Sequence, residues 1–270
     1  MPVTRFHPYH GENIRLYDDS MVAFRENSFA HAINFSETPL KPREIFLIEI
    51  VKNERGWSGH LRIGLTQHNP ASRFKLPQYA LPDLANLGQS WIFAVTKSHN
   101  KVFEEDPNGD CTQPYHSILG EGDYVSTYRG VFKRSLLRPL PRIEADGAIG
   151  GEGSGDEDSC ESILPTDVGS RIGIMYVVKQ NKAEMHFILN GEDQGPCAKD
   201  IPYGDKPLYA VVDVYGTTKT VRIVQLLGVS TLQNACRDVI LQQLKSRSDI
   251  NQLPIPVEEN RVALLQYAKP

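Results

Sequence analysis

The stretch Glu44-Ile-Phe-Leu-Ile-Glu-Ile-Val51 is the first clear indication of the fold. Its β-branched and aromatic residues are typical of a strand. Residues 60–66 then alternate regularly between apolar and polar side chains, and residues 6–35 alternate short apolar pieces with polar turns. These patterns predict short neighbouring strands of an antiparallel sheet.

More strands are predicted further along the chain. We expect them at residues 91–96, 171–178, 184–189, 208–214 and 221–227. Asn190-Gly191 is expected to turn the chain tightly, and long loops are expected at residues 67–88 and 98–121. Many short strands with turn signals, and no helical period before residue 230, predict a mainly β fold, an antiparallel β-sandwich.

Residues 144–162 differ sharply in composition from the rest of the chain. They are rich in Gly, Ser, Asp and Glu and contain almost no apolar surface. Such a segment cannot offset the entropy of ordering, which predicts a mobile insertion within the sandwich. A phosphate-binding loop is the alternative, but the segment is acidic and matches neither G-x-x-x-x-G-K-[ST] nor G-x-G-x-x-G.

The overall composition excludes several classes of protein. With 270 residues, the chain can form one large β domain, alone or with a small module. The formal net charge of -4 and the scattered basic residues argue against a nucleic-acid surface. No apolar run is long enough to span a membrane and the first residues resemble no secretory signal, so we expect a cytoplasmic location.

The sequence contains no arrangement typical of catalysis or metal binding. Its eight histidines form no H-E-x-x-H motif, no G-x-S-x-G elbow is present, and adjacent carboxylates fall in polar loops. The widely spaced cysteines form no C-x-x-C pair, which favours structural thiols: Cys111, Cys160, Cys197 and Cys236. We therefore expect a non-catalytic protein without a cofactor.

Binding to another protein is the expected function of the sandwich. Recognition residues are concentrated in loops that a rigid scaffold positions. Exposed aromatic residues among prolines suit a protein-docking groove, and we take Phe74, Tyr79, Phe103 and Tyr115 as candidate target-binding residues. Each of them could instead pack beneath its own loop as a local core.

A different pattern begins after the last predicted strand. Apolar residues recur at helical spacing in the order Leu232, Ala235, Cys236, Val239, Ile240 and Leu244. This predicts a small C-terminal α-helical module, which continues into Leu253-Pro254-Ile255-Pro256. The apolar face must pack either on the sandwich or on a partner protein, since so short a helix is marginal alone.

Residues 4–227 resemble the neuralized homology repeat. The resemblance rests on motifs that occur in order: Phe6-His-Pro-Tyr-His-Gly-Glu-Asn13, Ser28-Phe-Ala-His-Ala32, Gly56-Trp-Ser-Gly-His-Leu-Arg-Ile-Gly-Leu-Thr66, Leu81-Pro-Asp-Leu-Ala-Asn-Leu-Gly88, Trp91, Asn190-Gly-Glu-Asp-Gln-Gly195 and Pro207-Leu-Tyr-Ala-Val-Val-Asp-Val214. It implies a β-sandwich, related in shape to SPRY domains, that binds other proteins.

Residues 229–268 resemble a SOCS box. The elongin-binding pattern of that family is matched at Thr231, Leu232, Cys236 and Ile240, and its cullin-recognition pattern at Leu253, Pro254, Ile255 and Pro256. The resemblance implies binding to elongin B/C and to cullin type 5 with its RING subunit. Glu259 departs from it, because the pattern has an aliphatic residue there.

Together the two resemblances imply a substrate adaptor of an elongin/cullin-RING ubiquitin ligase. The sandwich would bind the target protein, and the SOCS box would recruit the ligase that ubiquitinates it for degradation. Two alternatives stay open: a non-degradative scaffold or trafficking protein that uses the same sandwich, and a carbohydrate-binding or hydrolytic sandwich.

Overall fold

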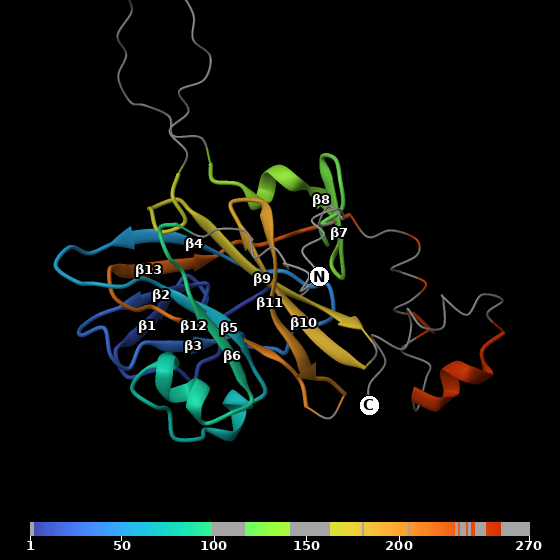
Figure 1. Cartoon of the computed structure of the whole chain (residues 1–270), viewed down its shortest axis with the longest axis horizontal. Coiled ribbons are helices and arrows are strands. Elements are labelled where there is room, and N and C mark those ends of the chain that lie inside the picture. The colour runs from blue at the N-terminus through green and yellow to red at the C-terminus, as the bar shows by residue number, and fades with distance from the viewer. Residues whose placement is uncertain are drawn as a thin grey trace, which may run out of the picture.

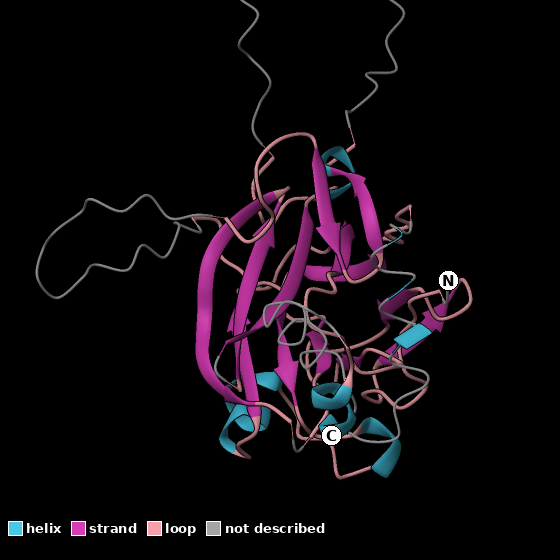
Figure 2. Cartoon of the chain, turned by 90° about the vertical axis from the view of Figure 1, so that its right-hand side faces the viewer, coloured by secondary structure: helices cyan, strands magenta, loops and turns pink. Residues whose placement is uncertain are grey.

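The computed structural model describes residues 3–98, 117–140, 163–179, 181–204, 206–229, 232, 236, 239–240 and 247–254. Figure 1 shows two β-sheets that dominate this part of the chain, and Figure 2 shows that its short helical turns lie outside them. All strand pairs are antiparallel. The predicted mainly β, antiparallel fold is therefore confirmed.

The larger sheet has seven strands. In spatial order they are β1 (Ile14–Tyr17), β2 (Val22–Arg25), β13 (Thr218–Ile223), β4 (Phe46–Asn53), β9 (Arg171–Lys179), β10 (Lys182–Leu189) and β11 (Glu192–Pro202). The last strand that the structure describes, β13, thus lies between β2 and β4. The early strands β1 and β2 therefore join the rest of the sheet only through β13, which comes late in the sequence.

The smaller sheet has four strands, and a separate hairpin adds two more. The four strands are, in order, β3 (Ile33–Phe35), β12 (Tyr209–Asp213), β5 (Arg62–Thr66) and β6 (Ser90–Ala94). The hairpin pairs β7 (Tyr124–Thr127) with β8 (Gly130–Lys133). The short helical turns are η1 (Pro70–Ser72), η2 (Ala80–Leu84), η3 (Arg134–Leu137) and η4 (Arg247–Gln252).

Apolar clusters cover both faces of the two sheets. The main core contains buried residues of both sheets, such as Ile48 of β4 and Ile63 of β5. Leu47, next to Ile48, faces the other way and packs in a second cluster with residues of the β7–β8 hairpin. A third cluster joins the smaller sheet to η2. Because both faces are buried, the central strands have continuous apolar sequences.

Three strand predictions need correction. No strand was expected at β11 or at the β7–β8 hairpin, although both are well paired. The strand predicted at residues 221–227 begins at Thr218 and ends at Ile223, because its pairing with β4 runs from Asn53 to Ile48. The turn at Asn190-Gly191 is confirmed, with positive φ at both residues.

The two described cysteines are both free and lie in different environments. Cys197 packs against the main core, its Sγ lies 3.2 Å from the Met185 carbonyl oxygen, and burial raises the pKa of its thiol to about 12. Cys236 is exposed. Cys111 and Cys160 lie outside the described residues.

Beyond the sandwich, the structure describes only part of the predicted helical module. Leu232, Cys236, Val239 and Ile240 have helical backbone, and η4 follows. The predicted insertion at residues 144–162 lies outside the described residues, so its place and the domain limits 4–227 and 229–268 stay predictions. None of the helices in the described ranges has the length and apolar character needed to cross a membrane.

Candidate functional site: the aromatic end of the sandwich

Aromatic side chains from four different loops meet at one end of the sandwich. We call this group, together with Arg62 at the start of β5, the aromatic end: Phe29, Trp57, Tyr79, Tyr215 and Arg62. The loops that carry Trp57 and Tyr215 join β4 to β5 and β12 to β13. They lie at the left of Figure 1, where β4 ends and β13 begins.

Phe29 is the centre of the ring contacts. Its ring centroid lies 4.8 Å from that of Trp57 and 5.3 Å from that of Tyr215, both in edge-on geometry. Tyr79 stacks against Phe29 at 6.0 Å. Edge-on and offset pairs are the favoured aromatic arrangements. Trp57 has 41% of its surface exposed, whereas the other three rings are half-buried, so the group presents one indole on an ordered aromatic base.

Arg62 contacts the rings of Tyr79 and Tyr215 through its guanidinium group. Its guanidinium carbon lies 3.5 Å from the ring centroid of Tyr215, a cation–π contact. One guanidinium nitrogen donates to the Leu81 carbonyl at 2.7 Å and lies 3.4 Å from the Asp213 carboxylate. Arg62 therefore ties the β12–β13 loop to the segment that begins η2.

Asp213 is the fully buried partner of Arg62. Its carboxylate also accepts a hydrogen bond from the backbone N–H of Ala80 at 3.0 Å. Burial raises the pKa of Asp213 to about 6, and the Ala80 N–H and Arg62 act in the opposite direction. Burial of the negative charge on Asp213, which pairs with Arg62, therefore costs free energy, and the carboxyl is ionised mainly above pH 6.

We expect Asp213→Asn to change how stability depends on pH. The folded-state pKa of about 6 lies above the unfolded value near 3.9, so the folded chain binds the proton more tightly. The contribution of Asp213 to the free energy of unfolding should fall by up to about 3 kcal/mol as pH rises from 4 to 7. The difference between wild type and variant, measured by urea unfolding at several pH values, should show this fall.

Asp19→Asn is the matched control for that measurement. Asp19 is exposed, and its hydrogen bond to Arg5 lowers the pKa of its carboxyl. Stability from this pair is present above the unfolded pKa and is lost only as pH falls below about 4. The difference between wild type and Asp19→Asn should thus be flat from pH 4 to 7. A flat result for Asp213→Asn as well would contradict the assignment.

A second buried charged side chain, Arg25 at the end of β2, holds the loops from inside the sandwich. Its fully buried guanidinium donates to the carbonyl oxygens of Gly216 at 2.7 Å, Thr218 at 3.2 Å and Asn27 at 3.1 Å. It also lies 3.5 Å from the Glu54 carboxylate. One side chain thus joins the loops that carry Phe29, Trp57 and Tyr215.

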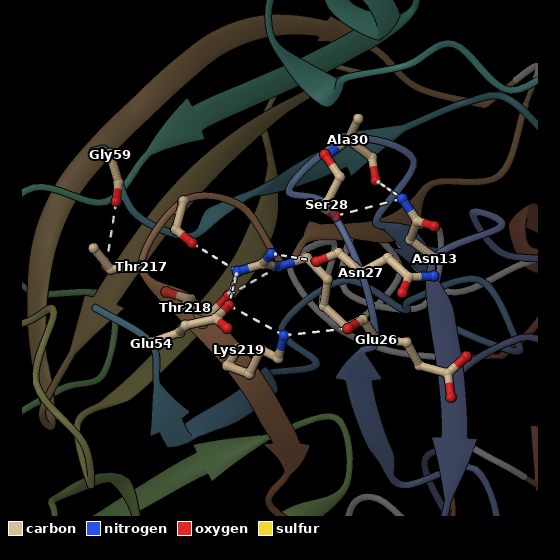
Figure 3. Close-up of polar contacts among 12 residues, drawn as sticks. Asn13, Glu26, Asn27, Ser28, Ala30, Glu54, Gly59, Thr217, Thr218 and Lys219 are labelled. Carbon is tan, nitrogen blue, oxygen red and sulfur yellow. Dashed lines mark hydrogen bonds and ion pairs between the residues drawn. The ribbon is translucent and has the colours of Figure 1, made fainter. Parts of the chain in front are cut away.

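Lys219 and Asn13 extend this polar network, as Figure 3 shows. Lys219 donates to Glu54 at 3.1 Å and to the Glu26 carbonyl at 3.3 Å. Its ammonium holds the pKa of the Glu54 carboxyl below its usual value. Asn13 donates to the Ala30 carbonyl at 2.8 Å. The loops of the aromatic end are therefore pre-ordered, which lowers the entropic cost of binding a partner.

The aromatic end has a composition that is typical of protein-binding surfaces. Aromatic and arginine side chains provide most of the energy at protein–protein interfaces. Among the residues that the structure describes, no three His, Cys, Asp or Glu side chains converge in a way that could hold a metal ion.

Of the two predicted target-binding residues that the structure describes, one belongs to the aromatic end. This residue is Tyr79, whereas Phe74 packs in a separate group, 6.0 Å from Phe35 and 5.0 Å from His68 between ring centroids. Phe74 also lies against the third apolar cluster, as expected if it forms a local core beneath its own loop. Phe103 and Tyr115 lie outside the described residues.

The predicted tail residues are partly described. Leu232 is 81% exposed, Cys236 is exposed and Ile240 is half-buried. Leu253 is half-buried and Pro254 is exposed. Thr231, Ile255 and Pro256 lie outside the described residues. The elongin and cullin assignments therefore stay predictions.

Sequence reasoning did not select four of the five members of the aromatic end. Phe29, Trp57, Tyr215 and Arg62 come from separate segments and become neighbours only in the folded chain. A signal was present, because two of the rings stand in turns beside glycines: Trp57 follows Gly56 and Tyr215 precedes Gly216. An aromatic residue in a glycine-containing turn has little local reason to be there.

A protein-family model described as Neuralized matches residues 6–225. The chain belongs to the Neuralized family. Neuralized-like protein 2 from Mus musculus is 40% identical to it, over 94% of this chain and 89% of that relative. The crystal structure of the Drosophila melanogaster neuralized-NHR1 domain covers 83% of this chain and 98% of its own, with a TM-score of 0.52 and 21% identity. That likeness shows the shared fold.

Members of the Neuralized family include named ubiquitin ligases. E3 ubiquitin-protein ligase NEURL1B from Mus musculus is 37% identical over 97 residues, which cover 35% of this chain and 18% of that relative. The family therefore has a place in the ubiquitin pathway. The aromatic end lies within the matched residues.

Proposed function

We propose that this protein is a non-catalytic substrate adaptor of a ubiquitin ligase in the cytoplasm. The aromatic end binds the target protein, and the tail recruits elongin B/C and cullin type 5 with its RING subunit. The observation that carries the proposal is the pre-ordered aromatic end on a Neuralized-family sandwich. Transfer of ubiquitin then follows from proximity between the target lysine and the conjugating enzyme.

The exposed tail supports the recruitment part of the proposal. Leu232 and Cys236 both have helical backbone and are four positions apart, the spacing that is typical of neighbours on one helix face. A leucine with 81% of its surface exposed is a typical anchor for a hydrophobic pocket on a partner. Val239 continues the same face and is also exposed.

Replacing Leu232 and Cys236 with glutamate should prevent elongin recruitment. Two charges would enter the interface without partners, and we expect binding to purified elongin B/C to weaken at least ~30-fold. Size-exclusion chromatography and calorimetry measure this directly. The melting temperature should stay unchanged, because both side chains are exposed and lie outside the described cores.

Leu87→Glu is the matched control, since Leu87 is an exposed leucine of the sandwich. It should leave elongin binding intact. Co-elution of the doubly substituted chain with elongin B/C would sink the recruitment proposal. The non-degradative scaffold would then become the better interpretation of the aromatic end.

A further inference from the structure

The β7–β8 hairpin covers part of the outer face of the larger sheet. Val125 and Phe132 of the hairpin pack with Leu47 of β4 and Met175 of β9 in the second apolar cluster. Leu226, which follows β13, is buried in the same cluster. The hairpin therefore contacts both the sheet and the chain that leaves the sandwich.

Buried polar contacts hold the hairpin in place. Arg129, at its turn, pairs with Glu44 at 2.5 Å, and both side chains are largely buried. Tyr128 donates its backbone N–H to the Arg43 carbonyl at 3.1 Å, and the Arg43 guanidinium donates to the Ser126 carbonyl at 3.2 Å. The hairpin is thus fixed at several points to Arg43 and Glu44, which lie just before β4.

Residues 224–229, which follow β13, pair with this hairpin. The Val224 N–H donates to the Leu47 carbonyl at 2.9 Å. Val229 and Val131 then exchange both backbone hydrogen bonds, at 3.1 and 2.9 Å. Residues 224–229 therefore continue along the sandwich beyond the end of β13, as the path toward β8 in Figure 1 shows.

Two glycines allow this close pairing. A Cβ atom on Gly130 would lie 2.6 Å from the Val229 carbonyl oxygen, and the φ of Gly130 is +105°. A Cβ atom on Gly228 would lie 2.8 Å from the Arg129 carbonyl oxygen. Backbone atoms cannot move aside as a flexible side chain can, so any larger residue at Gly130 must separate the two segments.

The pairing of β8 with residues 224–229 and the aromatic end lie at opposite ends of β13. Thr218 begins this strand three residues after Tyr215, and Ile223 ends it before the paired segment at residues 224–229 (Figure 1). We propose that the β7–β8 hairpin clamps residues 224–229, where the tail leaves the sandwich. The tail then starts in a fixed direction relative to a bound target. Gly130 is the positioning residue, because it allows the close approach of the two segments.

This inference rests on the proposed function and adds an element of geometry to it. A tail that starts from a fixed point confines the recruited ligase to part of the space around the target. Ubiquitin then reaches a restricted set of lysines. A tail released from β8 would spread the same ligase over a larger volume, which lowers the rate and widens the choice of lysine.

The first test concerns the chain alone. Hydrogen exchange at the backbone amides of Val131 and Val229 should be slow in the wild type and roughly tenfold or more faster in Gly130→Ala. Gly122→Ala is the control: Gly122 also has positive φ, at +86°, but its Cβ would meet nothing within 4 Å. Equal protection of Val229 in Gly130→Ala and wild type would overturn the clamp.

The second test uses the assembled ligase with the adaptor itself as the ubiquitin acceptor. Mass spectrometry should find few modified lysines with the wild type and more, each modified more slowly, with Gly130→Ala. Elongin affinity should be equal in both. An unchanged lysine pattern despite faster exchange at Val229 would overturn the positioning role.

A variant with a disulfide between β8 and the tail should behave like the wild type and not like Gly130→Ala. This test does not depend on whether Gly130→Ala folds. Val131→Cys with Val229→Cys places two thiols at directly paired positions of an antiparallel bridge, within the range of a disulfide. The oxidised form should keep the wild-type lysine pattern and rate. Loss of transfer on oxidation would overturn the proposal, because it would mean that the bridge must open. Failure of the proposed function would appear separately, as absent elongin binding in the wild type.

Discussion

Replacing Arg25 with methionine should lower the free energy of unfolding by about 3–5 kcal/mol. The substitution removes the donors of three carbonyl oxygens, on Gly216, Thr218 and Asn27, and methionine offers none in return. Buried acceptors left without a donor lose their solvation as well as their bond. The loss should be accompanied by disorder in three of the four loops of the aromatic end, those that carry Phe29, Trp57 and Tyr215, because Arg25 contacts each of them.

Chemical denaturation measures the first effect, and hydrogen exchange of residues 26–32, 54–61 and 214–217 measures the second. Arg15→Met is the control, since Arg15 is also paired with a glutamate, at 2.8 Å, but is more than half exposed. It should change stability by less than about 1 kcal/mol. A similar small change for Arg25→Met would mean that the loops are ordered by their other contacts.

Trp57→Ala should weaken target binding by about 30-fold or more while leaving the fold intact. Trp57 is the most exposed ring of the aromatic end, and its edge contact with Phe29 orders it before a partner arrives. Removal of a central interface tryptophan typically costs about 2 kcal/mol or more. Its exposure keeps the cost to stability small.

Affinity capture from a cell lysate can measure this effect before the target protein has been identified. The chain carrying Leu232→Glu and Cys236→Glu serves as bait, because proteins that it retains are not held through the proposed elongin site. Addition of Trp57→Ala should remove most of those proteins. Addition of Tyr124→Ala, an exposed aromatic of β7 outside the aromatic end, should remove none. Equal capture by both baits would exclude the aromatic end as the docking surface.

Strands with strong local signals were predictable from the sequence. Residues 44–51 and 171–178 are rich in β-branched and aromatic residues because both faces of β4 and β9 are buried. β11 carried no such signal: it contains Gly195, two prolines and several charged residues. It pairs only with β10 in the described sheet, through a register with several shifts, and an edge position tolerates prolines.

The candidate site was less predictable than the fold, for a physical reason. Tyr79 could be selected because it stands in a long loop among prolines, where an aromatic residue suggests exposure. Arg25 and Arg62 could not, since their value depends on carbonyl and carboxylate groups supplied by distant loops, with Arg25 and Thr218 separated by 193 positions. Such long-range polar contacts leave no periodic pattern in the chain.

The position of β13 within the larger sheet has a consequence for the synthesis of this protein. Until Thr218–Ile223 has been made, β2 and β4 lack the strand that lies between them, and Arg25 lacks its acceptors on Gly216 and Thr218. A chain ended prematurely within the sandwich would therefore expose two unpaired strand edges. The growing polypeptide can complete the aromatic end only shortly before the proposed elongin-binding segment is made, and we expect abortive products to compete poorly for the proposed targets.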